Sequence, residues 1–421
     1  MTGYDKRARA QGAVAVVGVD AGKFEHAMVV RPRGGRDTKP VLFKTSREGF
    51  EKAVAAILTA GGPGATPPDV LVGIEFAGTY GFTFAHFLHQ QGFPVVSVLP
   101  AHTKKWKEVV HNQNLKTDAK DAVGITDLVA QGHFVSFPFL DSVYADLRHL
   151  VSTRERLSLL RRGAITRLKA TLEVVFPEYE RIFVQITKPT ALAVLKKYPC
   201  PDAMLAAPKR QVMKLLRETS RNHLGAARYD ELIEAAEHTL ALTGTHRVLK
   251  DEVPMLIELI ETYAAQIAQV EALMAEALDR TPEAPYLLSI PGVAPVTAAV
   301  FLGSIGDPAA YDSSKQVLRV AGLTLVERSS GLLKGQKRIS KRGRPVFRRH
   351  AYIFAVRSVQ KDGLFRAEYE ALCARNGGRK IAALTAISRS ALKLMFSIAR
   401  DRRMYSVEVP RPAQRARASA A

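Results

Sequence analysis

Two short, almost uninterrupted apolar runs each end in a carboxylic acid, and they restrict the fold of this chain more than any other feature. The first, AVAVVGVD, covers residues 13–20 and ends at Asp20, and the second, VLVGIE, covers residues 70–75 and ends at Glu75. Apolar runs of this length are typical of strands buried on both faces of a sheet. The sequence therefore predicts two buried strands, each with an acid at or near its end.

A second pair of acids opens a predicted helix at residues 117–130, TDAKDAVGITDLVA. Asp118 and Asp121 are three residues apart, which puts them on one face of a helix with Cβ atoms roughly 5–6 Å apart. We expect this pair to converge with the strand-end acids. Carboxylates held that close repel and need a cation to stay ionised. Oxygen ligands alone favour Mg²⁺ or Mn²⁺ over zinc. Taken singly, each acid fits an ordinary strand end or helix start, whereas the set predicts a metal site.

The charge of the chain points to a polyanionic partner. Its 421 residues carry a formal net charge of +21, which indicates nucleic acid, with an anionic membrane surface as the rival. No apolar run reaches the ~18 residues of a membrane span, and the first residues contain no signal-peptide core. The two cysteines, Cys200 and Cys373, exclude a disulfide framework and a cysteine zinc site. We expect a cytoplasmic protein without membrane contact.

The first part of the chain alternates strand and helix patterns. Strands are predicted at residues 13–20, 26–32 and 40–45, then a helix at 47–60, a strand at 70–75, a helix at 83–93, a strand at 94–100 and the helix that carries the Asp pair. Three strands followed by helix–strand–helix–strand–helix is the element order of the ribonuclease-H-like fold. In that fold an acid on the first strand, one on the fourth and one on the last helix meet at the metal site. We therefore expect a domain at residues 1–141 of the mixed α/β class.

The rest of the chain is predicted to be helical. Residues 142–283 hold two long amphipathic patterns that favour an antiparallel or intersubunit coiled coil, with proline-rich short helices between them. A further domain is expected at residues 284–404, and the basic tail at 405–421 is expected to be disordered. Its first stretch, residues 286–308, resembles a helix-hairpin-helix, whose turn amides bind phosphate oxygens. An ordinary tight helix turn fits that stretch equally well.

Basic residues are concentrated in two segments. In the first, residues 100–122, five lysines approach the acids: Lys104, Lys105, Lys107, Lys116 and Lys120. The only tryptophan, Trp106, lies among them and fits either helix packing or stacking on a base. The second segment runs from Ser314 to His350 and holds eleven Lys or Arg against one acid, Glu327. The nucleic-acid contacts expected there are Lys334, Lys337, Arg338, Lys341, Arg342, Arg344, Arg348 and Arg349.

Two serines stand in the second basic segment. Ser329 and Ser330 precede Gly331 in what we interpret as a flexible cationic loop. A serine in such a loop can attack a phosphate and become covalently linked to DNA. Ser-Gly is also a common turn, so spacing alone leaves both interpretations open.

Three stretches together resemble a known family: GVDAGKFEHAMVV at residues 18–30, NLKTDAKDA at 114–122, and AGLTLVERSSG with RISKRGRPVFRRHAY at 321–331 and 338–352. They are similar to the DEDD transposases of the insertion-sequence-110 family and to the related Piv-type DNA invertases. The chain departs from the family in extra residues near 181–240 and in Gly343, Arg344 and Pro345, which replace the usual ISKxGN pattern.

The resemblance implies more than the composition does. It implies a RuvC-like first domain in which Asp20, Glu75, Asp118 and Asp121 hold Mg²⁺ or Mn²⁺. Ser330 would be the nucleophile that forms a 5′-phosphoserine link, with Ser329 as the alternative. Donor and target DNA would be the substrates and a structured noncoding bridge RNA the guide. The protein would act as a homo-oligomer, a dimer or tetramer, at the prokaryotic nucleoid.

Two other functions remain open from the residues alone. One is a RuvC-like Holliday-junction endonuclease, which would use the same four acids with a metal-activated water and would need no serine. The other is a non-catalytic nucleic-acid-binding scaffold in which the acids are structural. Both predict steep salt dependence of binding, so salt does not separate them from a transposase.

Overall fold

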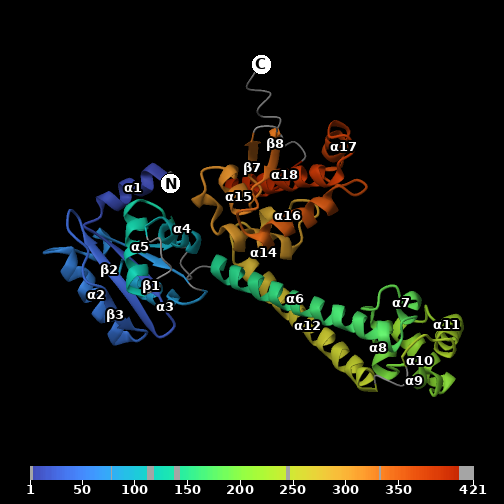
Figure 1. The fold of residues 1–421 in the computed structure, drawn as a ribbon. Coiled ribbons are helices and arrows are strands. Elements are labelled where there is room, and N and C mark those ends of the chain that lie inside the picture. Colours follow the sequence, from blue (N-terminus) through green and yellow to red (C-terminus); the bar gives the residue numbers. More distant parts are fainter. Residues whose placement is uncertain are drawn as a thin grey trace. The chain divides into compact units, whose positions relative to one another are not determined.

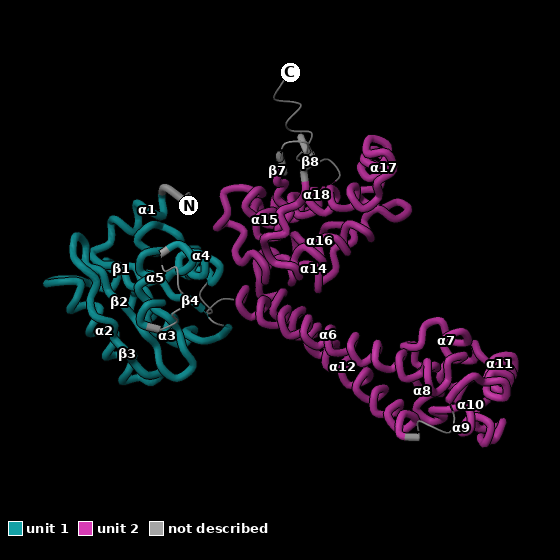
Figure 2. Tube along the Cα trace, in the orientation of Figure 1, with its two compact units in different colours: residues 1–141 teal, residues 142–421 magenta. Residues whose placement is uncertain are grey.

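The chain forms two compact units, residues 1–141 and residues 142–421 (Figure 2). The computed structural model describes residues 3–76, 78–110, 118–136, 143–242, 247–330 and 333–406. The expected disordered tail therefore lies almost wholly outside the described residues.

The first unit is built on a six-stranded sheet (Figure 1). Its strands run in the spatial order β3-β2-β1-β4-β5-β6, with β1 antiparallel to β2 and parallel to β4. The strands are β1 (Ala15–Ala21), β2 (Glu25–Pro32), β3 (Val41–Lys44), β4 (Val70–Glu75), β5 (Val95–Val98) and β6 (Val135–Ser136). The helices are α1 (Gly3–Gly12), α2 (Arg47–Gly61), α3 (Phe82–Gln90), α4 (Pro100–Val110) and α5 (Asp118–Ala130), with a 3₁₀ turn at Pro67–Asp69.

Helices cover both faces of this sheet, which is why its central strands are apolar throughout. On one face, Val17 and Val19 of β1 pack with Ile57 of α2 and Phe84 of α3. On the other face, Val16 of β1 packs in one cluster with residues of α5: Ile125, Leu128 and Val129. Since side chains alternate along a strand, Gly18 and Asp20 share the α5 face with Val16.

The second unit begins with a long helical hairpin. Helix α6 (Val143–Val175) lies beside α12 (Arg247–Asp279), as Figure 1 shows. Two ion pairs join them, Arg154 to Glu271 and Arg167 to Glu252, and a third joins Asp146 to Arg280, the residue after α12. As the residue number rises on α6, the partner's number falls on α12, so the helices are antiparallel.

Five short helices pack at the far end of the hairpin around a core of their own. They are α7 (Tyr179–Ile182), α8 (Pro189–Lys197), α9 (Pro201–Leu205), α10 (Lys209–Ser220) and α11 (Ala226–Glu237). Tyr179, Leu172 of α6 and Ile257 of α12 are fully buried there. The extra residues near 181–240 are therefore a packed helical body attached to the hairpin.

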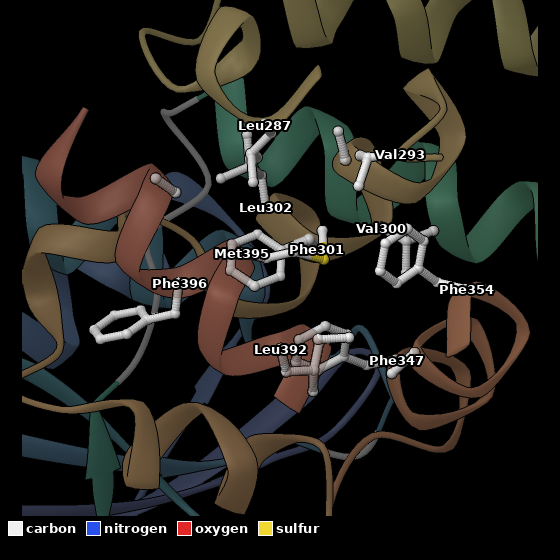
Figure 3. Close-up of a cluster of buried hydrophobic side chains, with 14 of the residues drawn as sticks. Leu287, Val293, Val300, Phe301, Leu302, Phe347, Phe354, Leu392, Met395 and Phe396 are labelled. Atoms are coloured by element: carbon white, nitrogen blue, oxygen red, sulfur yellow. The ribbon is translucent and has the colours of Figure 1, made fainter. Parts of the chain in front are cut away.

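The other end of the hairpin enters the largest hydrophobic core of the chain. Figure 3 shows Phe301, Phe347, Phe354, Leu392 and Met395 packed together in it. The elements around this core are α13 (Ala284–Leu288), α14 (Pro295–Ile305), the 3₁₀ turn Pro308–Ala310, α15 (Ser314–Val320), β7 (Leu325–Ser330), β8 (Leu333–Ile339), α16 (Pro345–Ser358), α17 (Arg366–Arg375) and α18 (Lys380–Asp401).

Helix α18 is the one helix in the described residues that is long and apolar enough to cross a membrane by length and composition. Half of its apolar window is buried in the protein, and Ile387, Leu392 and Met395 belong to the core. The apolar character of α18 is thus accounted for by its central place in this core.

The prediction of a mixed α/β unit followed by a mostly helical remainder is confirmed. The interpretation of the serine segment as a flexible loop is wrong, because Leu325–Ser330 and Leu333–Ile339 form an antiparallel hairpin. The run LTLVERSS alternates apolar and polar residues in part, which is a strand signal. The excess of Lys and Arg around it hid that signal.

Candidate active site

Asp20 and Glu75 are neighbours across the centre of the first unit. The parallel pairing of β1 with β4 places Asp20 directly opposite Glu75, as it places Gly18 opposite Gly73. Residues in register on adjacent strands point to the same face of the sheet. Both acids are half-buried, and both lie at the carboxyl end of their strands.

Helix α5 crosses this face at unusually close range, because two glycines leave room for it. A Cβ atom on Gly18 would lie 2.3 Å from the backbone nitrogen of Thr126 and 2.5 Å from the carbonyl oxygen of Ala122. A Cβ atom on Gly73 would lie 2.1 Å from a methyl carbon of Val129. The helix is therefore held against the two strands that carry the acids.

The direction of α5 brings its first turn to the acidic edge. Ala122 packs in one cluster with Ala27 and Val29 of β2, and Ala27 is the strand partner of Asp20. Asp121 is the residue before Ala122. Asp118 begins the helix, but its side chain lies outside the described part of the chain. All four predicted acids are thus carried by elements that meet at one edge, and the structure describes the side chains of three of them.

The Asp121 carboxylate forms an ion pair with a lysine side chain in this structure. The Lys107 Nζ of α4 lies 2.7 Å from Asp121 Oδ2, and the Asp121 side chain is only 8 % exposed. Burying an unpaired charge is costly, and the Lys107 ammonium group supplies the compensating charge. Among the described side chains, no three acids, histidines or cysteines lie close enough to hold a metal. The carboxylates at this edge nevertheless offer only oxygen atoms as ligands. The Lys107 ammonium group already brings a positive charge next to one of them, so this edge suits a hard divalent cation.

The fit of α5 on β1 yields a testable expectation for Gly18→Ala. The new methyl group collides with backbone atoms, which cannot move without shifting the helix, so overpacking should cost about 1–3 kcal/mol or more. We expect a lower denaturation midpoint, although no acid is changed. Gly12→Ala is the control, since nothing lies within 4 Å of that Cβ position. Equal midpoints for the two variants would contradict the close packing.

Trp106 is a packing residue of α4. Its ring lies where a side chain on Gly124 of α5 would be, since a Cβ atom there would come within 2.6 Å of the indole. It is also partly buried against the cluster formed by β1, β5 and α5. Of the two interpretations given by the sequence, helix packing is the one that this geometry supports.

The lysines around Trp106 have different surroundings. Lys104, Lys105 and Lys120 are exposed, whereas Lys107 is paired with Asp121. Lys116 lies outside the described residues. Three exposed lysines on α4 and α5 therefore provide positive charge on the two helices that border the acids.

The serines lie at the tip of the β7–β8 hairpin. Ser330 is the last residue of β7 and the strand partner of Leu333, the first residue of β8. A register shift between Arg328 and Ser330 marks a bulge near the tip, and bulges often re-aim side chains beside functional sites. The side chains of Ser329, Ser330, Lys334 and Lys337 lie outside what the structure describes.

The C-terminal basic residues divide into surface and packed groups. Arg338, Lys341 and Arg342 are exposed. Arg348 donates to the carbonyl oxygens of Ala321 and Lys341, which closes the base of the hairpin. Arg349 pairs with Glu155 of α6, so it joins the hairpin helices to the C-terminal core.

Arg344 lies near a second arginine, Arg148 of α6. Burial, followed by the nearby charge of Arg344, lowers the pKa of Arg148 to about 10. Desolvation also lowers the pKa of Arg344. Arg148 donates from Nε to the carbonyl oxygen of Gly303 at 3.0 Å, which fixes its place beside α14. Arg148 is half-buried and Arg344 is exposed, and two guanidinium groups in one area make it electropositive.

Sequence reasoning did not single out two aromatic residues close to the acids. Phe24 follows Asp20 by four residues and is 73 % exposed, and Tyr80 follows Glu75 by five residues and is 41 % exposed. The sequence signal was present in the KFE and TYG stretches next to the acids. Exposure, however, cannot be told from such short stretches.

Comparisons with known proteins find sequence similarity along most of the chain. The family model of DEDD transposases of IS110, described as a transposase, matches residues 17–177, and the model described as the transposase IS116/IS110/IS902 family matches residues 284–370. A 44.8 kDa protein of the insertion element IS116 from Streptomyces clavuligerus is 27 % identical over 94 % of this chain and 96 % of its own. A 42 kDa protein of IS900 from Mycobacterium paratuberculosis is 26 % identical over 92 % and 96 %. A 43.6 kDa protein of IS110 from Streptomyces coelicolor is 26 % identical over 75 % and 78 %.

Proposed function

The chain is a DNA transposase of the IS110 family of DEDD transposases, and on this premise we propose that it cuts and rejoins DNA strands with a divalent-metal site and a serine nucleophile. The metal site would be formed by Asp20, Glu75, Asp118 and Asp121. The nucleophile would be Ser330. The observation that carries the proposal is the register of β1 and β4, which makes Asp20 and Glu75 direct neighbours beneath the first turn of α5.

The strand order supports a RuvC-like assignment of the first unit. An antiparallel β3-β2-β1 meander continues into parallel β4 and β5. This is the sheet expected for a ribonuclease-H-like domain, with the helix of the last acids lying across it. The pairing of β1 with β4 agrees with the expectation that acids on the first and fourth strands act together.

The four acids would hold the metal through oxygen atoms alone, which suits Mg²⁺ or Mn²⁺. When bound, such ions stabilise both the attacking and the leaving oxygen of a phosphodiester. Lys107 has a different task, because its ammonium group balances the negative charge of Asp121 in an ion pair. It would also keep the acidic edge from repelling an incoming phosphate.

The serine would carry out the covalent step. Its hydroxyl oxygen attacks the phosphorus atom and loses its proton, while the bond from phosphorus to the 3′ oxygen breaks and that oxygen takes up a proton. The product is a 5′-phosphoserine and a free 3′-hydroxyl, and reversal with another 3′-hydroxyl rejoins the strands. Ser330 suits this role because it lies at a hairpin tip, where a backbone can approach a second surface.

The proposed partners are DNA, a guide RNA and further copies of this chain. Exposed lysines on α4 and α5 and exposed basic residues around β8 would bind phosphates of donor and target DNA. A structured noncoding RNA would select the DNA by pairing, and a homo-oligomer would join the acids of one subunit to the serine of another. The helix turn between α13 and α14, where Gly292 has φ of +83°, would contact a phosphate backbone. These activities would take place at the nucleoid in the cytoplasm.

The test is a joining reaction with the full-length protein, its copurifying nucleic acid and a plasmid that carries the ends of the element. Mg²⁺ should give cleaved and joined products, whereas EDTA should stop cleavage and leave DNA binding unchanged in a mobility-shift assay. Ribonuclease treatment before the reaction should abolish joining. Cleavage that continues in EDTA would refute the metal site, and joining that survives ribonuclease would refute the guide.

A further inference from the structure

Exposed aromatic residues flank the acidic edge of the first unit. Among its described residues, the large apolar side chains left in contact with water are Phe24, Leu42, Tyr80, Leu99 and Val109. Only two of these are aromatic, and each lies in the connection that leaves a strand carrying an acid. Phe24 lies in the turn between β1 and β2, and Tyr80 lies in the loop between β4 and α3.

The turn that carries Phe24 is held in place by hydrogen bonds. A Cβ atom on Gly22 would lie 2.2 Å from the carbonyl oxygen of Glu25, so the turn is too tight for any other residue there. The Thr45 backbone N–H donates to the carbonyl oxygen of Phe24 at 2.9 Å, and the Thr45 hydroxyl donates to that of Lys23 at 3.2 Å. Phe24 is thus presented to solvent by a fixed backbone.

The loop that carries Tyr80 is fixed against the same strand end. Gly81 has φ of +85°, and a Cβ atom on it would lie 2.7 Å from the Cβ of Ala21 and 3.3 Å from a methyl carbon of Ile74. Ala21 is the last residue of β1, directly after Asp20. Tyr80 therefore starts from a backbone position next to the acid-bearing ends of both β1 and β4.

Leaving the Phe24 side chain in water costs free energy, although other aromatic residues nearby are packed together. Burying a Phe side chain is worth about 1.5–3 kcal/mol, and an aromatic cluster of Phe43, Phe50 and Phe84 lies on the neighbouring elements. Phe24 is left out of it. A protein-binding patch would need a contiguous apolar area of several hundred Å², whereas Phe24 has the Lys23 ammonium 4.9 Å from its ring centroid. An aromatic ring beside a cation suits a nucleobase with its phosphate.

We propose that Phe24 and Tyr80 form a stacking site for an unpaired nucleobase of the DNA strand that is cut at the acidic edge. This rests on the proposed function of that edge. Phe24 supplies an aromatic face, Lys23 neutralises the adjoining phosphate, and Tyr80 limits where the base can lie. A base held there fixes the register of the strand, so that the next phosphate meets Asp20 and Glu75. Phe24 and Tyr80 are thus positioning residues for the cleaved phosphate.

The site can be located by photocrosslinking. Full-length protein is bound in EDTA to a single-stranded DNA oligonucleotide that contains 5-iodouracil, irradiated, digested with trypsin and analysed by mass spectrometry. The crosslink should fall on Phe24, in the tryptic peptide of residues 24–33, because trypsin does not cut between Arg31 and Pro32, or on Tyr80. Crosslinks found only elsewhere would overturn the proposal. An RNA oligonucleotide of the same sequence should crosslink less at these positions, and stronger RNA crosslinking would overturn the assignment to the DNA strand.

Substitutions separate stacking from simple contact. Since base stacking on an aromatic residue is worth about 1–3 kcal/mol, Phe24→Ala should weaken binding of a 5-iodouracil-free oligonucleotide about 5- to 100-fold. Phe24→Leu should weaken binding as much as Phe24→Ala does, because the apolar volume remains but the ring is lost. Phe24→Trp keeps an aromatic ring and should bind as the wild type does. Leu42→Ala is the matched control, because Leu42 is 50 % exposed on the edge strand β3. Equal affinity for the wild type and Phe24→Leu would refute stacking.

These measurements are independent of the catalytic proposal. They are made without divalent metal, so they detect binding alone. If these measurements detect no stacking on Phe24 while the wild type still cleaves DNA, this inference fails and the proposed function stands. If stacking is found but cleavage needs no metal, the stacking site stands and the proposed metal site fails.

Discussion

Glu75→Gln is expected to slow strand cleavage about a thousandfold while DNA binding and folding stay intact. A metal-bound oxygen supplies several kcal/mol of transition-state stabilisation, and each 1.36 kcal/mol corresponds to a tenfold change in rate. The amide has the same size as the carboxylate, so the pairing of β4 with β1 is kept. Removing one of several like charges should leave the thermal midpoint unchanged or raise it. Cleavage is measured as single-turnover nicking of end-labelled DNA in Mg²⁺.

Glu25→Gln is the matched control for this variant. Glu25 is an exposed carboxylate at the start of β2, where it pairs across the sheet with Lys44, and it lies at the same edge of the sheet as the acids. Its loss removes the same charge without touching the predicted metal ligands. If Glu25→Gln and Glu75→Gln slow cleavage equally, the effect comes from the overall charge of this edge and the metal site is not where we propose.

Ser330→Ala is expected to abolish the covalent protein–DNA adduct completely. No other atom of residue 330 can form the ester, so the loss should be total, and Ser329→Ala should retain the adduct. The adduct is detected as a DNA-labelled band that survives denaturing electrophoresis and disappears after protease treatment. Both variants lie at the hairpin tip, so differences in folding between them should be small, and circular dichroism checks this.

The products of Ser330→Ala also separate the candidate functions. Adducts lost in Ser329→Ala instead would move the nucleophile by one residue. Normal cleavage in both variants, with free 5′-phosphates and no attached protein, would indicate a Holliday-junction endonuclease that uses water. Absence of cleavage in the wild type under every metal condition would indicate a non-catalytic scaffold.

The positions of Asp20 and Glu75 show how far a sequence can lead. Their apolar runs identified two buried strands, and buried strands pair with each other, so two acids at strand ends had a good chance of being neighbours. The family resemblance, which rests on the stretches around Asp20, Asp118 and Ser330, is confirmed by the family models. The exact register of Asp20 with Glu75 came only from the folded sheet.

Trp106 and Lys107 show where the sequence stops being informative. Both are in one lysine-rich helix, and their side chains could equally have faced solvent or DNA. In the fold, Trp106 lies over Gly124 and Lys107 binds Asp121, because α4 packs along α5. That choice depends on how these two helices meet each other and the sheet, which no local pattern encodes.

The sequence by itself determined the class of each unit, the strands that carry the acids and the family of the chain, because periodicity and short motifs are local properties. Only the tertiary structure decided the register of Asp20 with Glu75, the hairpin that contains Ser330, the ion pair between Lys107 and Asp121, and the exposure of Phe24. Each of these depends on contacts between separate strands and helices, and their free energies arise only once those elements have packed.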